Sequence, residues 1–243
     1  MSYNALSLRV ILVLPVLGLV AGCAKAPPAV PIGDGLTVVA PDIAFERSLK
    51  AGKLPADWVV VGNVPKGALS IAVVNGTAAL QVDGSAEPFA VMRRTKASLL
   101  ATPYLTWGWN VVPTRKGPHP VQVVVGLRDK SQPKRRSWLD LGDKDASVDR
   151  LITIVWEETA LGRGTVIGPI QRNDEAERAR YIARGGQEQG QRWWIDTVDL
   201  SLIHHQIWPK DKPANMDIVL IGVAVAKADR NGVMNLAHVR LNR

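Results

Sequence analysis

Cysteine is almost absent from this chain: Cys23 is the only one among 243 residues. One cysteine cannot form an intramolecular disulfide, so a disulfide framework is excluded. An exported domain of this size often uses disulfides, because its compartment is oxidising. The fold must therefore depend on packing alone, and Cys23 needs another explanation.

Sequence motifs for cofactors, metals and nucleophilic catalysis are also missing. Gly162, Gly164 and Gly168 fit neither the dinucleotide-binding nor the P-loop spacing, and they predict a tight turn. His204 and His205 are adjacent without a cysteine pair or an HExxH pattern, so they do not predict a zinc site. No Gly-x-Ser-x-Gly elbow is present either. We expect no metal and no cofactor.

The composition is that of a globular protein. Hydrophobic residues make up 47% of the chain and charged residues 21%, which leaves enough apolar material to bury a core. The formal net charge of +8 favours anionic partners such as lipid head groups, lipopolysaccharide phosphates or acidic glycans. A solvated basic surface without a specific partner is the alternative.

The N-terminus reads as an export signal. Arg9 is the only charge ahead of an apolar run at 10–20, which is too short to span a bilayer comfortably. Val-Ala-Gly-Cys at 20–23 resembles the lipobox of bacterial lipoproteins, which implies cleavage before Cys23 and lipidation of its thiol. Two or three acyl chains anchor a protein stably. The alternative is an ordinary cleaved secretory signal in which the cysteine occurs by chance.

The lipoprotein resemblance also predicts the location. Ala24, rather than Asp, follows the cysteine, which by this resemblance favours sorting to the outer membrane with the domain facing the periplasm. We therefore expect a signal peptide at 1–22, a lipidated cysteine with a flexible Pro- and Ala-rich tether at 23–35, and a single domain at 36–243. Nucleic acid fits the charge but not this compartment, so we expect no nucleic-acid partner.

Short alternating segments recur through the predicted domain and indicate strands. Asn75-Gly76 separates two of them and is the strongest short hairpin signal. At 104–111 Leu105, Trp107, Trp109 and Val111 share one face, opposite polar or small residues. Strands are expected at 58–61, 69–74, 77–82, 89–94, 104–111, 121–127, 151–156 and 218–226.

The last segment predicts a further strand, and two segments predict helices. At 236–241, Ala237, Val239 and Leu241 are expected on one face, with Leu236, His238 and Arg240 on the other. A helix is expected at 196–207, and residues 174–184 suit a helix or a strand. The whole pattern predicts a mostly β protein: a jelly-roll, galactose-binding-like β-sandwich with one or two short helices.

The order of these segments is similar to the DUF3047 family of bacterial proteins of unknown function. The resemblance covers 45–241 and is carried by LPADW at 54–58, PYLTWGW at 103–109, IVW at 154–156, the glycine-rich turn, Trp194 and IGVAV at 221–225. It implies a galactose-binding type of sandwich. Two acidic segments of the family are largely missing here: one place reads GPHP at 117–120, and at the other only Asp229 remains.

The eight tryptophans are the best indication of a ligand, because exposed indoles stack on sugar rings. Trp107 and Trp109 are expected in the core. Trp193 and Trp194 are adjacent, so one of them should be exposed or at a rim. Trp138 follows a basic run and is a further candidate. The candidate ligand-binding residues are Trp138, Trp193, Trp194, Lys134, Arg135, Arg136 and Asp229.

The leading functional hypothesis is an envelope lipoprotein with a non-catalytic domain that binds carbohydrate or another envelope component. The first alternative is a glycan hydrolase using Glu157 or Glu158, because such enzymes need paired carboxylates. Asp196 and Asp199 are better explained as helix N-terminal residues. The second alternative is a protein–protein adaptor in an envelope assembly.

Overall fold

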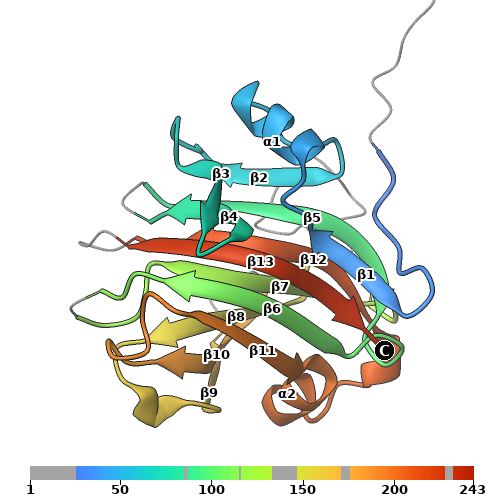
Figure 1. Ribbon diagram of the computed structural model, residues 1–243. Coiled ribbons are helices and arrows are strands. Elements are labelled where there is room, and N and C mark those ends of the chain that lie inside the picture. The colour runs from blue at the N-terminus through green and yellow to red at the C-terminus, as the bar shows by residue number, and fades with distance from the viewer. Residues whose placement is uncertain (1–25, 85–86, 115, 133–146, 171–175, 228–231) are drawn as a thin grey trace, which may run out of the picture.

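The protein is a two-sheet β-sandwich of the jelly-roll type with two short α-helices (Figure 1). The computed structural model describes residues 26–84, 87–114, 116–132, 147–170, 176–227 and 232–243. The two-sheet sandwich confirms the expected fold class of a mostly β, jelly-roll protein. No helix in these ranges is long and apolar enough to cross a membrane.

The first sheet has six strands in the order β11-β6-β13-β4-β3, with β1 also pairing with β13. Every pair in it is antiparallel. β4 pairs with the first part of β13 and β1 with the last part, so the two share one edge of that strand. The strands are β1 (Gly35–Val39), β3 (Leu69–Val74), β4 (Thr77–Asp83), β6 (Tyr104–Val111), β11 (Trp193–Asp199) and β13 (Val233–Asn242).

The second sheet has seven strands in the order β2-β5-β12-β7-β8-β10-β9. β8 and β10 run parallel, and the other pairs are antiparallel. β8 lies inside the sheet, as its apolar sequence predicted. The strands are β2 (Trp58–Gly62), β5 (Phe89–Ser98), β7 (Val121–Asp129), β8 (Arg150–Glu157), β9 (Val166–Ile170), β10 (Glu177–Gly185) and β12 (Met216–Val225).

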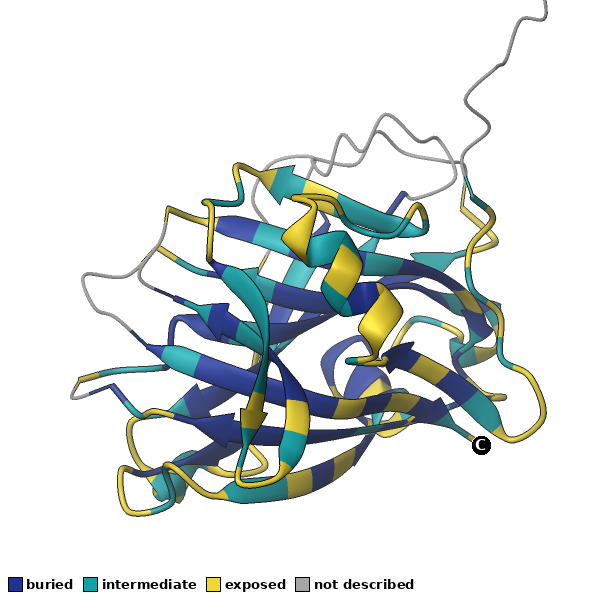
Figure 2. Ribbon diagram, turned by 45° about the horizontal axis from the view of Figure 1, so that its top comes forward, coloured by how far each residue is buried: buried dark blue, intermediate teal, exposed yellow. Residues whose placement is uncertain are grey.

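The main core lies between the two sheets, where the buried positions of their strands gather (Figure 2). Indole rings form its centre. Trp107 and Trp109 are fully buried, as the alternation in β6 predicted. Trp109 packs edge-on against Trp107 at 5.3 Å and against Trp156 of the opposite sheet at 5.4 Å. Such edge-to-face pairs stabilise beyond the area that they bury.

The helices begin at aspartate caps. In α1 (Ile43–Lys50) the carboxylate of Asp42 accepts a hydrogen bond from the amide of Phe45. In α2 (Leu200–Ile207) the carboxylate of Asp199 accepts from two amides. The second helix is therefore shorter than the helix predicted at 196–207, and Asp196 belongs to β11. The ambiguous segment at 174–184 forms β10. One-turn 3₁₀ helices occur at Ala160–Gly162 and Pro213–Asn215.

The segment before β1 is attached to the sandwich. The amide of Ala29 donates to the carbonyl of Arg94, and the amide of Lys96 donates to the carbonyl of Ala29. The guanidinium of Arg94 donates to the carbonyl of Ala26 at 2.6 Å. Within the described residues, contacts with the sandwich therefore already include Ala26, ahead of the domain start expected at residue 36.

Candidate functional site

The outward face of the six-stranded sheet carries a row of uncharged polar side chains. Because directly paired residues share a face, Trp193, Asn110, Asn235, Gln81 and Ser70 form one row across five strands. Gln81 donates to the side chain of Asn235 at 3.0 Å, and Asn235 donates to the carbonyl of Asn110 at 3.4 Å. These bonds hold the amides in fixed orientations, and Asn110 and Asn235 are buried at 4% exposure each.

This outward face is concave. The indole nitrogen of Trp193 on β11 donates to the carbonyl of Val74 on β3 at 2.9 Å. β11 and β3 are the two ends of the sheet path, and in a flat sheet they would lie about 19 Å apart at about 4.8 Å per strand. The hydrogen bond therefore requires the β3–β4 hairpin to arch over the face, as Figure 2 shows. We call this outward surface of β11, β6, β13 and β4 the concave face.

Gly108 lies near the middle of the concave face. A Cβ placed on it would lie 3.8 Å from Trp193 Cε3 and 3.8 Å from His238 Cδ2. β6 lies between β11 and β13, so the indole and the imidazole approach Gly108 from opposite sides. Gly108 and its pairing partner Ala237 are both buried, so the two rings cover this part of the face.

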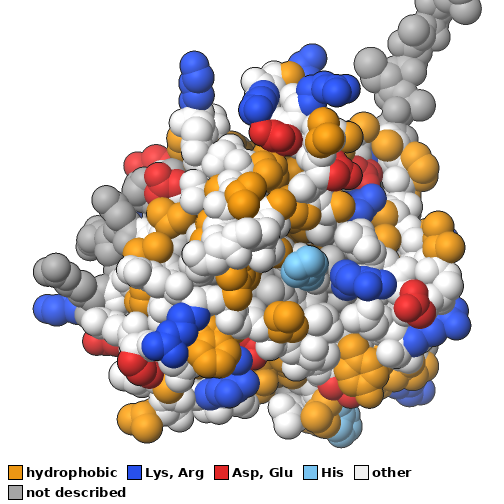
Figure 3. Space-filling model, viewed as in Figure 1, with side chains coloured by type: hydrophobic (Ala, Val, Ile, Leu, Met, Phe, Trp, Pro, Cys, Tyr) orange, Lys and Arg blue, Asp and Glu red, His pale blue; other side chains and the backbone are white. Residues whose placement is uncertain are grey.

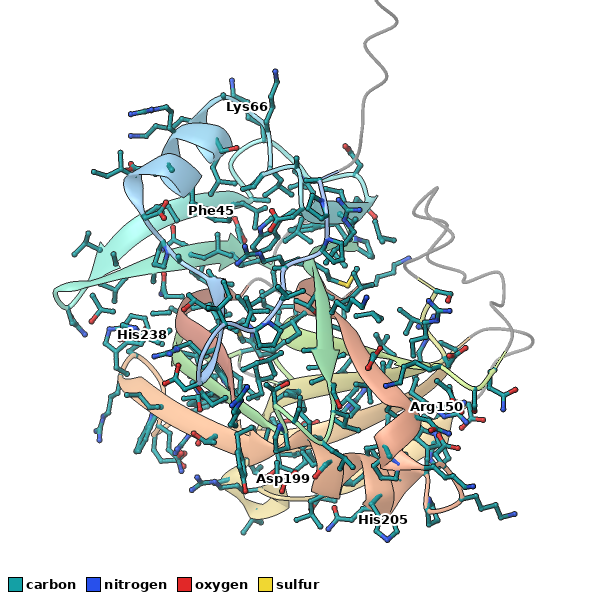
Figure 4. The ribbon with its side chains drawn as sticks, turned by 90° about the vertical axis from the view of Figure 1, so that its right-hand side faces the viewer. Phe45, Lys66, Arg150, Asp199, His205 and His238 are labelled. Atoms are coloured by element: carbon teal, nitrogen blue, oxygen red, sulfur yellow. The ribbon has the colours of Figure 1, made fainter. Side chains whose placement is uncertain are left out.

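His238 reaches this position through a β-bulge. The pairing of β13 with β6 shifts register between Ala237 and Arg240, and His238 adopts a φ of 54°. The extra residue changes the alternation, so that Leu236 enters the core together with Val239. The expectation that Leu236 would share a face with His238 and Arg240 is therefore wrong. Ala237 pairs with Gly108 on the outward face, so its expected placement beside Val239 and Leu241 is wrong as well. Figure 4 shows His238 projecting from the outer side of the sandwich.

A second polar group lies further along the concave face. The hydroxyls of Thr106 and Thr197 are 2.9 Å apart, and Asn242 donates to Thr106 at 3.2 Å. Tyr104 is the first residue of β6 and is 41% exposed. Arg240 is paired with Thr106 in the sheet, and its guanidinium lies 4.0 Å from the carboxylate of Asp34.

Charges are sparse in the middle of this surface. In Figure 3, which views this sheet from outside, uncharged and hydrophobic side chains occupy the middle of the face around one histidine. Lysine, arginine and acidic side chains lie mainly around its rim. The accessible part of the concave face thus offers the hydroxyls of Thr106 and Thr197, ring surfaces and the guanidinium of Arg240 to one side. These features suit a ligand with many hydroxyls.

The two adjacent tryptophans predicted as ligand-binding residues lie on opposite faces of β11. Trp193 points outward into the concave face. Trp194 points inward, donates to the carbonyl of Gln189 at 2.8 Å, and has the guanidinium of Arg184 over its ring at 3.9 Å. Trp193 therefore remains the candidate for ligand contact. The other predicted site residues, Cys23, Lys134, Arg135, Arg136, Trp138 and Asp229, lie outside the described residues.

The carboxylates considered for hydrolysis have other partners. Glu157 lies 3.5 Å from the guanidinium of Arg180, and Glu158 accepts a hydrogen bond from the amide of Gly117. Asp196 does not cap a helix as predicted. It is buried between the sheets, where Arg184 and Trp109 donate to it. Within the ranges that the structure covers, no group of three His, Cys, Asp or Glu residues could hold a metal ion.

No family model matches this chain, and no curated protein matches it. The resemblance to the DUF3047 family therefore remains a prediction.

The sequence analysis did not predict Gly108, His238 or Arg240 as residues of the concave face. The alternation of small and polar residues opposite the core positions of β6 was the available signal for Thr106 and Gly108.

Solved structures of similar shape belong to carbohydrate-active proteins. Endoglucanase 3 of Trichoderma harzianum, from glycoside hydrolase family 12, is 10% identical, with a TM-score of 0.41 over 72% of this chain and 82% of that one. A mannan-recognising carbohydrate-binding module is 12% identical, with a TM-score of 0.35 over 87% and 96%. A module specific for non-crystalline cellulose is 14% identical, with a TM-score of 0.38 over 87% and 97%. At these identities and scores, no residue role or ligand transfers to this chain.

Proposed function

We propose that this protein is a bacterial envelope lipoprotein whose domain binds a glycan without cleaving it. The observation that carries the proposal is the concave face, where the exposed hydroxyls of Thr106 and Thr197 lie between Trp193 at one end and Tyr104 at the other. Tyr104 lies six positions before Asn110, the partner of Trp193, on β6, which corresponds to roughly 20 Å. Such a face can follow an extended chain of sugars.

The chemistry of the face suits sugar rings. Sugar hydroxyls both donate and accept hydrogen bonds, as do amide and hydroxyl side chains. The apolar faces of sugars pack on aromatic rings, and burying such rings contributes much of the energy at binding sites. Binding is favoured over hydrolysis because Glu157, Glu158 and Asp196 are bound to protein partners on other parts of the sandwich.

The lipid anchor at Cys23 is part of the proposal and gives the domain its position. Cys23 lies three positions before Ala26, which contacts the domain, and this stretch of chain spans at most about 10 Å. An acylated Cys23 would hold the domain against the outer membrane rather than on a long tether. Mass spectrometry of the native N-terminus tests the anchor: we expect a cleaved, acylated Cys23, and an uncleaved start at Met1 would contradict it.

Replacing Trp193 or Tyr104 with alanine should weaken glycan binding by about tenfold or more, because each change removes an aromatic contact. Binding is measured by titration calorimetry with soluble peptidoglycan fragments and envelope polysaccharides on the domain without its signal peptide. Leu161→Ala is the control, because Leu161 is 96% exposed and lies in the 3₁₀ turn after β8, away from the concave face. Equal affinities for all variants would contradict a site on this face.

A further inference from the structure

The end of the sandwich at α1 carries a group of exposed cations. They are Arg47 and Lys50 of α1 and, further along the chain, Lys53 and Lys66. Lys50 pairs with Glu46 within the helix at 2.7 Å, and the other three have no acidic partner among the described residues. We call these four side chains the basic end. Figure 3 shows lysine and arginine side chains gathered at this end of the molecule.

The helix at the basic end is held firmly on the sandwich. Phe45 is buried, and its ring lies 5.3 Å from the ring of Trp58 on β2. Ile43, the first residue of α1, is 74% exposed beside the cations. Cations around an exposed apolar side chain are typical of helices that lie on an anionic membrane. Because α1 is packed on the sheet, a contact made here orients the whole domain.

A buried guanidinium joins the basic end to the segment that precedes β1. Nη2 of Arg94 donates to the carbonyl of Ala26 at 2.6 Å and to the carbonyl of Ala56 at 2.9 Å, and Arg94 is 7% exposed. Lys53 lies three positions before Ala56, which is at most about 10 Å along the chain. Cys23 precedes Ala26 by the same number of positions. A lipid on Cys23 would therefore enter the membrane within short reach of Lys53.

We propose that the basic end lies on the membrane and binds the phosphate head groups of anionic phospholipids. This inference rests on the proposed lipid anchor at Cys23 and adds the orientation of the domain to it. Phosphate oxygens accept hydrogen bonds from ammonium and guanidinium groups. Each lysine or arginine close to an anionic leaflet contributes about fivefold to binding. The strands of the concave face lie below α1 in Figure 1, so this orientation leaves that face open to ligands.

Binding to head groups is tested with the mature chain carrying Cys23→Ser, so that only the protein surface can hold it. We expect it to sediment with vesicles of phosphatidylethanolamine and phosphatidylglycerol, and not with vesicles in which phosphatidylcholine replaces the phosphatidylglycerol. Lys53→Gln combined with Lys66→Gln should weaken this binding about 25-fold, because two of the cations are removed. Equal binding to both kinds of vesicle would overturn the proposal.

The matched control removes the same charge at the opposite end of the molecule. Figure 4 shows Lys66 and Phe45 at one end and His205 of α2 at the other. Lys210 and Lys212 follow α2 and are exposed. Lys210→Gln combined with Lys212→Gln should bind within about twofold of the original, because screened charges act only close to the membrane. If this control loses as much affinity, the attraction is one of net charge and the assignment to the basic end fails.

The orientation is tested on the acylated protein by reaction with an acetylating reagent, read out by mass spectrometry. In vesicles with phosphatidylglycerol, Lys50, Lys53 and Lys66 should react about fivefold more slowly than in vesicles without it, because head groups cover them. Lys210 and Lys212 should react equally in both. If an acidic polysaccharide protects the same three lysines in detergent as strongly as the anionic vesicles do, the occupant is a glycan and the assignment to lipid is wrong.

The outcomes separate this inference from the proposed function. If Cys23 is acylated but the lysines of both ends react alike in the two kinds of vesicle, the orientation is wrong while the lipoprotein stands. If native Cys23 carries no lipid, the anchor is wrong, and binding of the Cys23→Ser chain to anionic vesicles alone would then support the basic end. If that chain does not bind them either, both are wrong.

Discussion

Asp196→Ala is expected to lower the free energy of unfolding by about 3–5 kcal/mol, because it leaves a buried guanidinium without its counter-charge. Arg184 donates to both carboxylate oxygens of Asp196, at 2.8 and 2.7 Å, and both side chains are less than a tenth exposed. The indole nitrogen of Trp109 donates to the same carboxylate at 2.9 Å. The loss is measured by urea unfolding at neutral pH.

Two further variants separate the charge from the packing at this pair. The double variant Asp196→Ala with Arg184→Met should recover most of the loss, since replacing a buried ion pair with apolar residues costs little. Arg163→Ala should cost less than about 1 kcal/mol, because Arg163 is 57% exposed and lies 3.3 Å from Asp196. If the single Asp196 variant is as stable as the original, the pair does not hold the two sheets together.

Acid is expected to destabilise the fold through His119. Burial lowers the pKa of His119 from 6.5 to about 4, and its Nδ1 accepts a hydrogen bond from the amide of Val121 at 3.1 Å. The folded protein therefore takes up this proton less readily than the unfolded chain. The stabilising contribution is complete above pH 6.5 and is lost as the pH falls toward 4. At about 1.4 kcal/mol per pH unit, the stability lost by pH 4 is roughly 3 kcal/mol.

His119→Asn isolates this contribution, because the asparagine oxygen can still accept from Val121 but does not titrate in this range. The difference in unfolding free energy between the two proteins should shrink by roughly 3 kcal/mol between pH 7.5 and pH 4. His204 is also buried, which lowers its pKa, and it remains in both proteins. A difference that stays constant with pH would show that His119 does not carry the effect.

The fold could be predicted where the signal is local. Asn75-Gly76 joins β3 and β4, with Asn75 at a φ of 48° and Gly76 at 78°, as a tight hairpin requires. The alternation at 104–111 placed Trp107 and Trp109 in the core. Both signals depend on neighbours a few residues away, so the sequence is sufficient to read them.

The site depended on contacts that are distant in sequence. The bulge at His238 changes which residues face outward, and a regular alternation cannot reveal it. The contact between Trp193 and Val74 joins strands at opposite ends of the sheet path. Asp196 has the spacing of a helix cap, but its partner Arg184 lies in the other sheet. Each of these features arises only when the two sheets are assembled.

Chemical-shift mapping of the isotope-labelled domain during titration with a soluble glycan tests the location of the site most directly. We predict that the amide signals of Thr106, Thr197 and His238 and the indole signal of Trp193 shift together, because these groups lie on the same concave face. Shifts confined to outward residues of the seven-stranded sheet, such as Thr153 and Arg180, would place the ligand on the other side of the sandwich and contradict the account.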